Sequence, residues 1–235
     1  GLGQETVGIT KFCVHPEEWF RHKTRVGGTK QVKAEKIAAL QPTLIIGNKE
    51  ENDKEQVEAL AEQYPVWLSD VRTLEDALDM IRSIGTLTDR EAAAGQLAAT
   101  IGADFKALAE ELKGKCRQKA AYLIWRKPYY AVAADTFIDD MLRRAGFENV
   151  FRHKSRYPEI SLAELSGAGP ETILLSSEPY PFREEHREEL RHACPLSTLK
   201  FVDGQLFSWY GSRLLLSAGY FRELRQGLTE AYHTL

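Results

Sequence analysis

The sequence predicts an α/β protein in which one long, rigid helix joins two doubly wound α/β lobes. Short β-forming runs alternate with helical patterns before residue 88, and the alternation resumes after residue 118, which is typical of parallel sheets covered by helices. Between these regions, residues 88–113 contain no proline and keep one helical periodicity. We therefore divide the chain into an N-terminal lobe of residues 1–87, an inter-lobe helix of residues 88–118 and a C-terminal lobe of residues 119–235.

The composition narrows the class of protein. A chain of 235 residues can bury an adequate core. It has 31 basic and 34 acidic side chains and a net charge of −3, so it lacks the basic excess of a general nucleic-acid binder. No apolar run is long enough to span a bilayer. The cysteines at positions 13, 116 and 194 are odd in number and far apart, which argues against a disulfide framework. The charged helix faces are compatible with a monomer, which we expect.

The sequence of the N-terminal lobe predicts short strands that alternate with short helices. The run TLIIG at 43–47 is continuously apolar, as in strands that are buried on both faces of a parallel sheet. Pro42 ends the helix before it, and Thr73 with Asp76 forms a capping pair at the start of a later helix. Strands are expected at 6–10, 43–47 and 66–68, and helices at 33–40, 52–63 and 73–84.

The central helix is predicted from its cap and its apolar face. Thr88 and Glu91 have the spacing of a capping box, and Gly114 is expected to end the helix. At 1.5 Å per residue the helix would be roughly 35–40 Å long. Its inward face consists of residues spaced three or four apart: Leu97, Ile101, Phe105, Leu108 and Leu112.

The C-terminal lobe repeats the alternation. Strands are expected at 120–125, 150–151, 172–176 and 200–202, and helices at 136–145, 162–165, 183–192 and 212–233. Several acidic pairs fall on these helices, and we interpret them as solvated faces rather than acid/base pairs. They are Asp139 with Asp140, Glu184 with Glu185 and Glu188 with Glu189.

Aromatic rings, cations and prolines collect where the predicted strands end. In open α/β sheets, ligands bind beyond the carboxyl ends of the strands. Rings offer stacking area, and Arg and Lys attract carboxylate or phosphate, so we expect a flat or bulky, partly anionic ligand. For any single ring the alternative is that it only covers the end of the sheet. The predicted ligand-binding residues are Lys11, Phe12, His15, Lys49, Trp125, Arg126, Tyr129, Tyr130, Glu178, Tyr180, Phe182, Trp209, Tyr210 and Arg213.

Cys13 and His15 suggest an alternative. They lie two residues apart, so an extended segment would place them on one face, where either could bind a soft metal and Cys13 could act as a nucleophile. Two ligands do not make a zinc site, so His15 is only a weak metal candidate, and a buried structural role competes for Cys13. The sequence contains no complete phosphate loop and no G-x-S-x-G hydrolase motif.

Two stretches resemble a known family. VGGTKQVKAEKIAALQPTLIIGNKEENDKEQVEAL at 26–60 and VDGQLFSWYGSRLLLSAGYFREL at 202–224 resemble the first lobe and the last strand, turn and helix of the helical-backbone periplasmic binding proteins. These are the substrate-binding components of ABC importers for vitamin B12, haem and ferric siderophores, and the chain is most similar to the cobalamin-binding-like branch. The resemblance implies a class III periplasmic binding protein fold from which the first strand and helix of lobe one are missing.

The resemblance also implies a function. The chain would capture an iron chelate, haem or cobalamin-like ligand in the inter-lobe cleft and deliver it to permease subunits, without catalysis and without an obligatory cofactor. Surface carboxylates would dock on the permease, and the candidates for this role are Glu51, Glu55, Glu184 and Glu185, with Glu50 and Glu178 also considered.

The expected location is periplasmic or extracytoplasmic. No signal peptide is visible in this chain, which leaves a cytoplasmic location open. The two alternatives are therefore an intracellular α/β enzyme that uses Cys13 and His15, and a chelate-binding protein that stays in the cytosol. The sequence does not identify the ligand.

Overall fold

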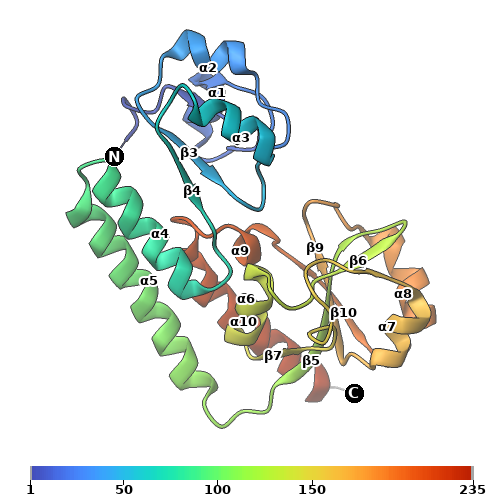
Figure 1. The fold of residues 1–235 in the computed structure, drawn as a ribbon. Coiled ribbons are helices and arrows are strands. Elements are labelled where there is room, and N and C mark those ends of the chain that lie inside the picture. Colours follow the sequence, from blue (N-terminus) through green and yellow to red (C-terminus); the bar gives the residue numbers. More distant parts are fainter. Residues whose placement is uncertain (1, 234–235) are drawn as a thin grey trace. The chain divides into compact units, whose positions relative to one another are not determined.

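The computed structural model describes residues 2–233, with side chains described through residue 228. The chain divides into two compact units, Gly1–Asp70 and Val71–Leu235 (Figure 1). This division differs from the predicted one, which ended the first lobe at residue 87. The helix at 74–87 shares a core with elements of the second unit, because its apolar side chains pack there. The mixed α/β class is as predicted.

The first unit holds two pairs of short parallel strands. β1 (Gly8–Ile9) pairs with β2 (Thr24–Arg25), and β3 (Ile45–Asn48) pairs with β4 (Val66–Ser69). The helices between them are α1 (Glu17–His22), α2 (Ala34–Leu40) and α3 (Lys54–Ala61). Asp53 caps α3 by accepting a hydrogen bond from the Gln56 backbone amide.

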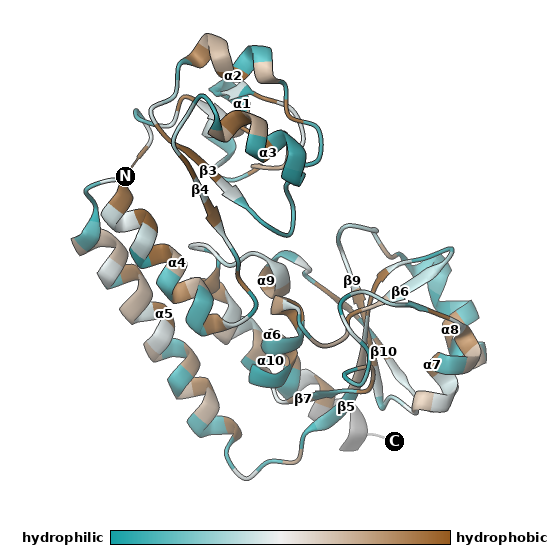
Figure 2. Ribbon diagram, viewed as in Figure 1, coloured by the Kyte–Doolittle hydropathy of each residue, from teal (hydrophilic) through white to brown (hydrophobic). Residues whose placement is uncertain are grey.

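The prediction that the TLIIG strand is buried on both faces is wrong. Ile46 is 45% exposed and Leu68 is 37% exposed, although β3 and β4 are strongly hydrophobic in Figure 2. Within the described residues β3 pairs with β4 alone, and a two-stranded ribbon has too few neighbours to cover both of its faces.

A six-stranded mixed sheet forms the centre of the second unit. Its order is β10-β9-β5-β6-β8, and β7 pairs with the first part of β5. The strands are β5 (Gln118–Trp125), β6 (Tyr129–Ala131), β7 (Phe147–Asn149), β8 (Glu159–Ile160), β9 (Thr172–Ser176) and β10 (Thr198–Val202). β5, β7, β9 and β10 run parallel, whereas β6 and β8 are antiparallel additions.

Residues 126–130 do not form the simple loop that the sequence predicts. Tyr129 and Tyr130 belong to β6, which turns back on β5 so that Leu123 faces Ala131. A hairpin of this kind needs only a short connection, and Lys127 adopts the left-handed conformation that the turn requires, with φ at 61°. The strand predicted at 150–151 lies slightly earlier, at β7.

Helices cover both faces of this sheet, as expected for a doubly wound unit. Successive residues of β5 alternate between two cores: Tyr122 packs into the larger one, and Ala121 and Leu123 pack into the smaller. The helices that follow β5 in the sequence are α6 (Phe137–Arg144), α7 (Leu162–Ala168), the 3-10 turn η1 (Glu184–His186), α8 (Arg187–Ala193), α9 (Gln205–Ser208) and α10 (Leu214–His233).

Two long helices, α4 (Leu74–Leu87) and α5 (Glu91–Leu112), run side by side in the second unit (Figure 1). Gly85 permits their close approach, since a Cβ at this position would lie 2.4 Å from the Ala94 Cβ. α5 buries Ile101, Phe105 and Leu108, in agreement with the predicted inward face, and ends before Gly114.

The predicted capping box at Thr88 and Glu91 is wrong. Thr88 ends α4, because its hydroxyl donates to the Ile84 carbonyl at 2.7 Å, and α5 begins after Arg90 with no side-chain cap. Asp89 between them has a φ of 53°, which breaks the helical path. The capping box of Thr73 and Asp76 is present as predicted.

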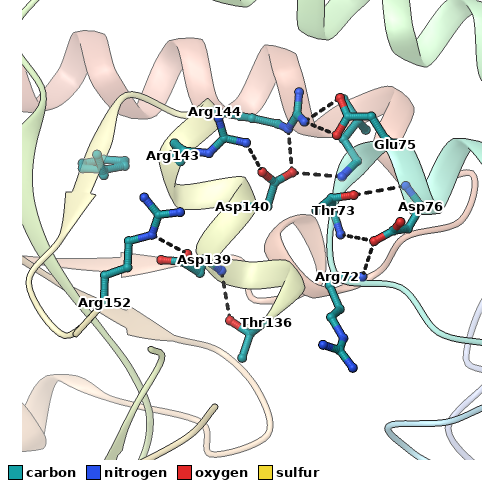
Figure 3. A network of polar contacts seen from close by, with 12 residues as sticks. Arg72, Thr73, Glu75, Asp76, Thr136, Asp139, Asp140, Arg143, Arg144 and Arg152 are labelled. Carbon is teal, nitrogen blue, oxygen red and sulfur yellow. Dashed lines mark hydrogen bonds and ion pairs between the residues drawn. The ribbon is translucent and has the colours of Figure 1, made fainter. Parts of the chain in front are cut away.

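Asp139 and Asp140 are buried, so the prediction of a solvated face is wrong for them. Asp140 accepts hydrogen bonds from the Leu74 backbone amide at 2.9 Å and from Arg144 Nε at 2.6 Å, and it also binds Arg143 (Figure 3). Burial alone would raise the pKa of Asp140, but these hydrogen bonds lower it below its ordinary value. The carboxylate thus joins the start of α4 to α6.

Asp139, the preceding residue of α6, has its own partners. Its carboxylate accepts a hydrogen bond from the Asn149 amide at 2.9 Å and lies 3.2 Å from Arg152 Nε.

Among the described residues, no helix is long and apolar enough to cross a membrane.

Candidate functional site

The carboxyl ends of β5, β9 and β10 carry a connected group of aromatic and charged side chains in the second unit. The segment at 177–182, which follows β9, is central to it. Its Tyr180 backbone amide donates to the Ile124 carbonyl at 3.3 Å, which holds the segment beside the end of β5. This placement brings predicted residues from three separate strands together, as expected for the ligand edge of an α/β sheet.

Trp125 and Tyr180 form the aromatic part of this site. Their ring centroids are 5.6 Å apart at an interplanar angle of 62°, a favourable edge-to-face arrangement. Trp125 is 41% exposed. An exposed indole that is fixed by a second ring offers a flat surface on which a planar ligand can stack.

His186 fixes Tyr180 from the other side. Its Nδ1 accepts a hydrogen bond from the Arg183 backbone amide at 2.9 Å, and its Nε2 lies 3.1 Å from the Tyr180 hydroxyl oxygen. A neutral imidazole with Nδ1 as acceptor carries its proton on Nε2, so His186 donates to Tyr180. Glu185, a predicted docking residue, lies 3.4 Å from the same Nε2.

Glu178 holds Trp209 in place. The carboxylate oxygen Oε1 of Glu178 accepts one hydrogen bond from the Trp209 indole Nε1 and a second from the Ser208 hydroxyl, both at 2.8 Å. The backbone allows this approach because residue 204 is glycine: a Cβ there would lie 2.7 Å from the Glu178 Cγ and 2.4 Å from the Ser176 Oγ. Glu178 therefore acts on a neighbouring ring within the protein.

Arg213 and Tyr210 complete the group. The Arg213 guanidinium lies 6.0 Å from the centre of the Trp209 ring and 3.8 Å from an Asp203 carboxylate oxygen, so its charge stays at the edge of the site. Tyr210 packs edge-to-face on Phe137, with 5.2 Å between ring centres.

Arg126 forms an ion pair within the protein. Its Nε and Nη2 donate to Glu189 Oε2 at 3.0 and 2.6 Å, and the Tyr129 hydroxyl donates to the same oxygen at 3.1 Å. The hydrogen bond from Arg126 lowers the pKa of Glu189, and burial together with the adjacent Glu189 raises the pKa of Tyr129 to about 12. Glu189 is therefore not the solvated carboxylate that the sequence predicts.

Two predicted ligand residues have little surface to offer. Tyr129 is 6% exposed and Phe182 is 7% exposed, and both pack into the smaller core. Their position agrees with the alternative that such rings cover the end of the sheet. Tyr130, on the same strand as Tyr129, is only half-buried.

The predicted residues of the first unit lie on exposed loops. The Lys11 ammonium lies 4.9 Å from the centre of the Phe12 ring, and Phe12 is 53% exposed. Lys49, after β3, pairs with Asp70 at 3.0 Å. Lys11 also lies against Gly28, where a Cβ would be 3.2 Å from the Lys11 Cε, so the loop after β1 and the Gly27-Gly28 turn are neighbours.

Cys13 and His15 are both on the loop after β1. Cys13 is half-buried, with its sulfur 3.4 Å from the Thr10 hydroxyl, and His15 is exposed. The described residues include no group of three or more His, Cys, Asp or Glu side chains that could hold a metal ion.

The predicted docking carboxylates lie at exposed positions. Glu51 follows β3 and Glu55 is in the first turn of α3. Glu184 pairs with Arg187 at 3.1 Å at the start of α8.

Sequence reasoning missed three residues that organise the site: His186, Glu189 and Ser208. Each acts by hydrogen bonding to a predicted residue: His186 to Tyr180 in the same segment, and Glu189 and Ser208 to residues distant in sequence. Only Ser208 had a sequence signal, since it is adjacent to Trp209 in the strand-end segment.

Comparison with proteins of known sequence identifies the family of this chain. The family model described as "Periplasmic binding protein" matches residues 1–199. The vitamin B12-binding protein of Vibrio campbellii is 27% identical over 179 residues, which are 75% of this chain and 64% of that protein. The vitamin B12-binding protein of Pectobacterium carotovorum is 25% identical over 227 residues, covering 93% of this chain and 79% of that protein.

Solved structures show the same fold. The periplasmic haem-binding protein BhuT, in complex with two haems, matches with a TM-score of 0.82 at 19% identity, over 94% of this chain and 89% of that one. The vitamin B12-binding protein BtuF of Vibrio cholerae matches with a TM-score of 0.78 at 17% identity, over 93% and 89%. The chain belongs to the periplasmic binding protein family.

Proposed function

We propose that this chain is the substrate-binding component of an ABC-type importer and that it captures a corrinoid, haem or iron-chelate ligand. The proposal rests on family membership together with one structural observation, the paired Trp125 and Tyr180 rings beside the Glu178–Trp209 pair. Corrins and haems are flat, apolar over most of their area and anionic or polar at the rim. Fixed rings with a cation at their edge suit such a ligand.

The ligand would contact the exposed indole of Trp125 and the half-buried Trp209, with Arg213 placed toward anionic side groups of the ligand. Glu178 and His186 would hold the rings without contacting the ligand. Arg126 would contribute to the rigidity of the edge through Glu189. Such a site is largely formed before binding, which reduces the ordering cost of capture.

The names of the relatives support this assignment. Proteins named as vitamin B12-binding match this chain along most of its length, and the chain matches 64% of the length of the Vibrio campbellii relative. We infer that the protein works outside the cytoplasm with permease subunits and catalyses no reaction. Glu51 or Glu55 and Glu184 or Glu185 are the proposed docking residues.

The test is capture of coloured ligands. The purified chain is mixed with cyanocobalamin, haem or a ferric catecholate chelate and passed through a gel-filtration column, with the absorbance of the ligand followed beside that of the protein. One of the three should elute with the protein at a ratio near one to one. Elution of all three as free ligand would contradict the proposal.

A further inference from the structure

A hollow in the Val71–Leu235 unit is basic and lies away from the proposed ligand edge. It is a concave pocket of about 360 Å³, formed by the segment between α5 and β5, the carboxyl end of α6 and the side of α10. No acidic residue is among its lining residues. Six of its lining residues are basic: Lys113, Lys115, Arg117, Arg143, Arg144 and Arg225.

Two of these cations have a structural explanation. Arg143 and Arg144 both bind the buried Asp140, and Arg144 also binds Glu75 at 2.6 Å (Figure 3). They neutralise carboxylates behind the wall of the pocket. These two arginines are therefore explained by contacts within the protein and are not evidence for an anionic ligand.

Arg117 and Lys115 differ from them. Arg117 Nη1 donates to the Arg143 carbonyl at 3.0 Å and the Phe147 carbonyl at 3.4 Å, so neutral groups fix its position and leave its charge in place. Among the side chains that the structure describes, through residue 228, neither Arg117 nor Lys115 forms an ion pair. Glu111, whose pKa is lowered mainly by its hydrogen bond from Arg222, is also close enough to Lys115 for the two charges to interact. Lys113 lies 3.5 Å from Glu110 in an exposed contact, which offsets its charge.

The ends of two helices account for part of this positive charge. α5 ends at Leu112 and α6 ends at Arg144, and a helix carboxyl end is equivalent to roughly −0.5 elementary charge. Together the two ends balance about one cation. Lys113, Lys115 and Arg117 supply three cations at this place, and Glu110 offsets one of them, so the pocket keeps a positive excess of about one charge.

We propose that this pocket binds a small polyanion with phosphate groups, of the size and charge of pyrophosphate. A guanidinium fork held by carbonyl groups, beside two flexible ammonium groups, matches the oxygen geometry of phosphate. The pocket volume lies within the range of small-molecule sites. A neighbouring hollow of about 280 Å³ shares Arg117 and Arg143 with it but is also lined by Asp139 and Glu148, which makes it less suited to an anion.

This pocket is distinct from the proposed capture site. It precedes β5 at Gln118, whereas Trp125 is the last residue of that strand. Eight strand residues at about 3.3 Å each separate the two ends by roughly 25 Å. The inference therefore does not depend on the proposed function.

Isothermal titration calorimetry with inorganic pyrophosphate tests the inference. The wild-type chain should bind with an affinity that falls as sodium chloride is added. The double variant K113Q/K115Q should bind about tenfold more weakly, since two charge-assisted contacts are lost. Both lysines are exposed, so this variant should fold; its melting temperature checks that. K106Q, on the exposed face of α5 outside the pocket, is the matched control and should bind like the wild type.

Three results would overturn the inference. The first is no binding of pyrophosphate by the wild type at low ionic strength. The second is equal binding by K113Q/K115Q, which would show contact elsewhere. The third is binding to phosphatidylglycerol vesicles without binding to pyrophosphate, which would replace a pocket ligand by a lipid surface. Weaker binding of orthophosphate than of pyrophosphate would support the polyanion assignment.

Discussion

The indole Nε1–H of Trp209 donates a 2.8 Å hydrogen bond to the Glu178 carboxylate, and the Ser208 hydroxyl donates to the same oxygen. The relationship changes the role of Glu178 from a ligand contact or a docking residue to a residue that positions a ring. Because both donors use Oε1, a glutamine could replace the glutamate with its amide oxygen in the same place.

The first prediction follows from this shared acceptor. E178A should weaken ligand binding about tenfold, since loss of a hydrogen bond to a charged group releases the Trp209 ring. E178Q should retain most of the affinity. The readout on the free protein is the indole N–H resonance of Trp209 in a ¹H–¹⁵N spectrum, which should shift in E178A and stay close to its wild-type position in E178Q. Equal ligand affinity and equal Trp209 resonances in E178A and E178Q would contradict the role of Glu178 in positioning the Trp209 ring.

The second prediction concerns the buried Asp140. D140A leaves Arg143, Arg144 and the Leu74 amide without their acceptor, so urea unfolding should show a loss of about 2–4 kcal/mol. E75A removes only an exposed partner of Arg144, and its cost should stay below about 1 kcal/mol. A D140A protein as stable as E75A would show that the network in Figure 3 contributes little.

The third prediction is the pH dependence of the same group. The folded state lowers the pKa of Asp140, so the unfolded chain binds more protons over the range between the two pKa values. The stabilisation is therefore present above the unfolded pKa of about 3.9 and is lost as the pH falls through the lower, folded value. The stability difference between wild type and D140N should shrink below about pH 4, and a difference that grows on acidification would contradict this sign.

The fourth prediction uses two glycines of the paired helices. G85A places a Cβ 2.4 Å from the Ala94 Cβ, so it should destabilise the protein by about 1–3 kcal/mol through overpacking. G95A has no atom within 4 Å of its new Cβ and should stabilise α5 by about 0.5–1 kcal/mol. Thermal melting of the two variants should therefore move in opposite directions. A stabilised G85A would mean that α4 and α5 can separate at little cost.

Local patterns of the sequence predicted the α/β class, the capping box at Thr73 and the burial of Phe105, because each of these depends on residues a few positions apart. Thr88 was misplaced since two capping choices were available within one turn. Its hydroxyl donates to the carbonyl of Ile84, in the preceding turn, instead of accepting a hydrogen bond from the Glu91 backbone amide. The close approach of Gly85 to Ala94 beside this turn is a tertiary contact, which local sequence patterns do not reveal.

The residues predicted for the site gather at the ends of β5, β9 and β10, but several of them have partners that the sequence did not indicate. Arg126, predicted to bind the ligand, pairs with Glu189, which is 63 residues away in sequence. Asp140 was expected in solvent and instead accepts a hydrogen bond from Leu74, 66 residues away. Hydrogen bonds between residues so far apart leave no periodic pattern in the sequence. The composition at strand ends therefore suggests which side chains gather there, and the three-dimensional fold is needed to identify the partner of each one.

The most direct test of the capture site is a tryptophan fluorescence titration with cyanocobalamin, haem and a ferric catecholate chelate. The chain contains four tryptophans, so W125F and W209F should each be compared with the wild type. We predict saturable quenching by one of the ligands at one equivalent, reduced in both W125F and W209F. The absence of saturable quenching by all three ligands, or quenching that persists unchanged in both W125F and W209F, would contradict ligand capture at the ends of β5, β9 and β10.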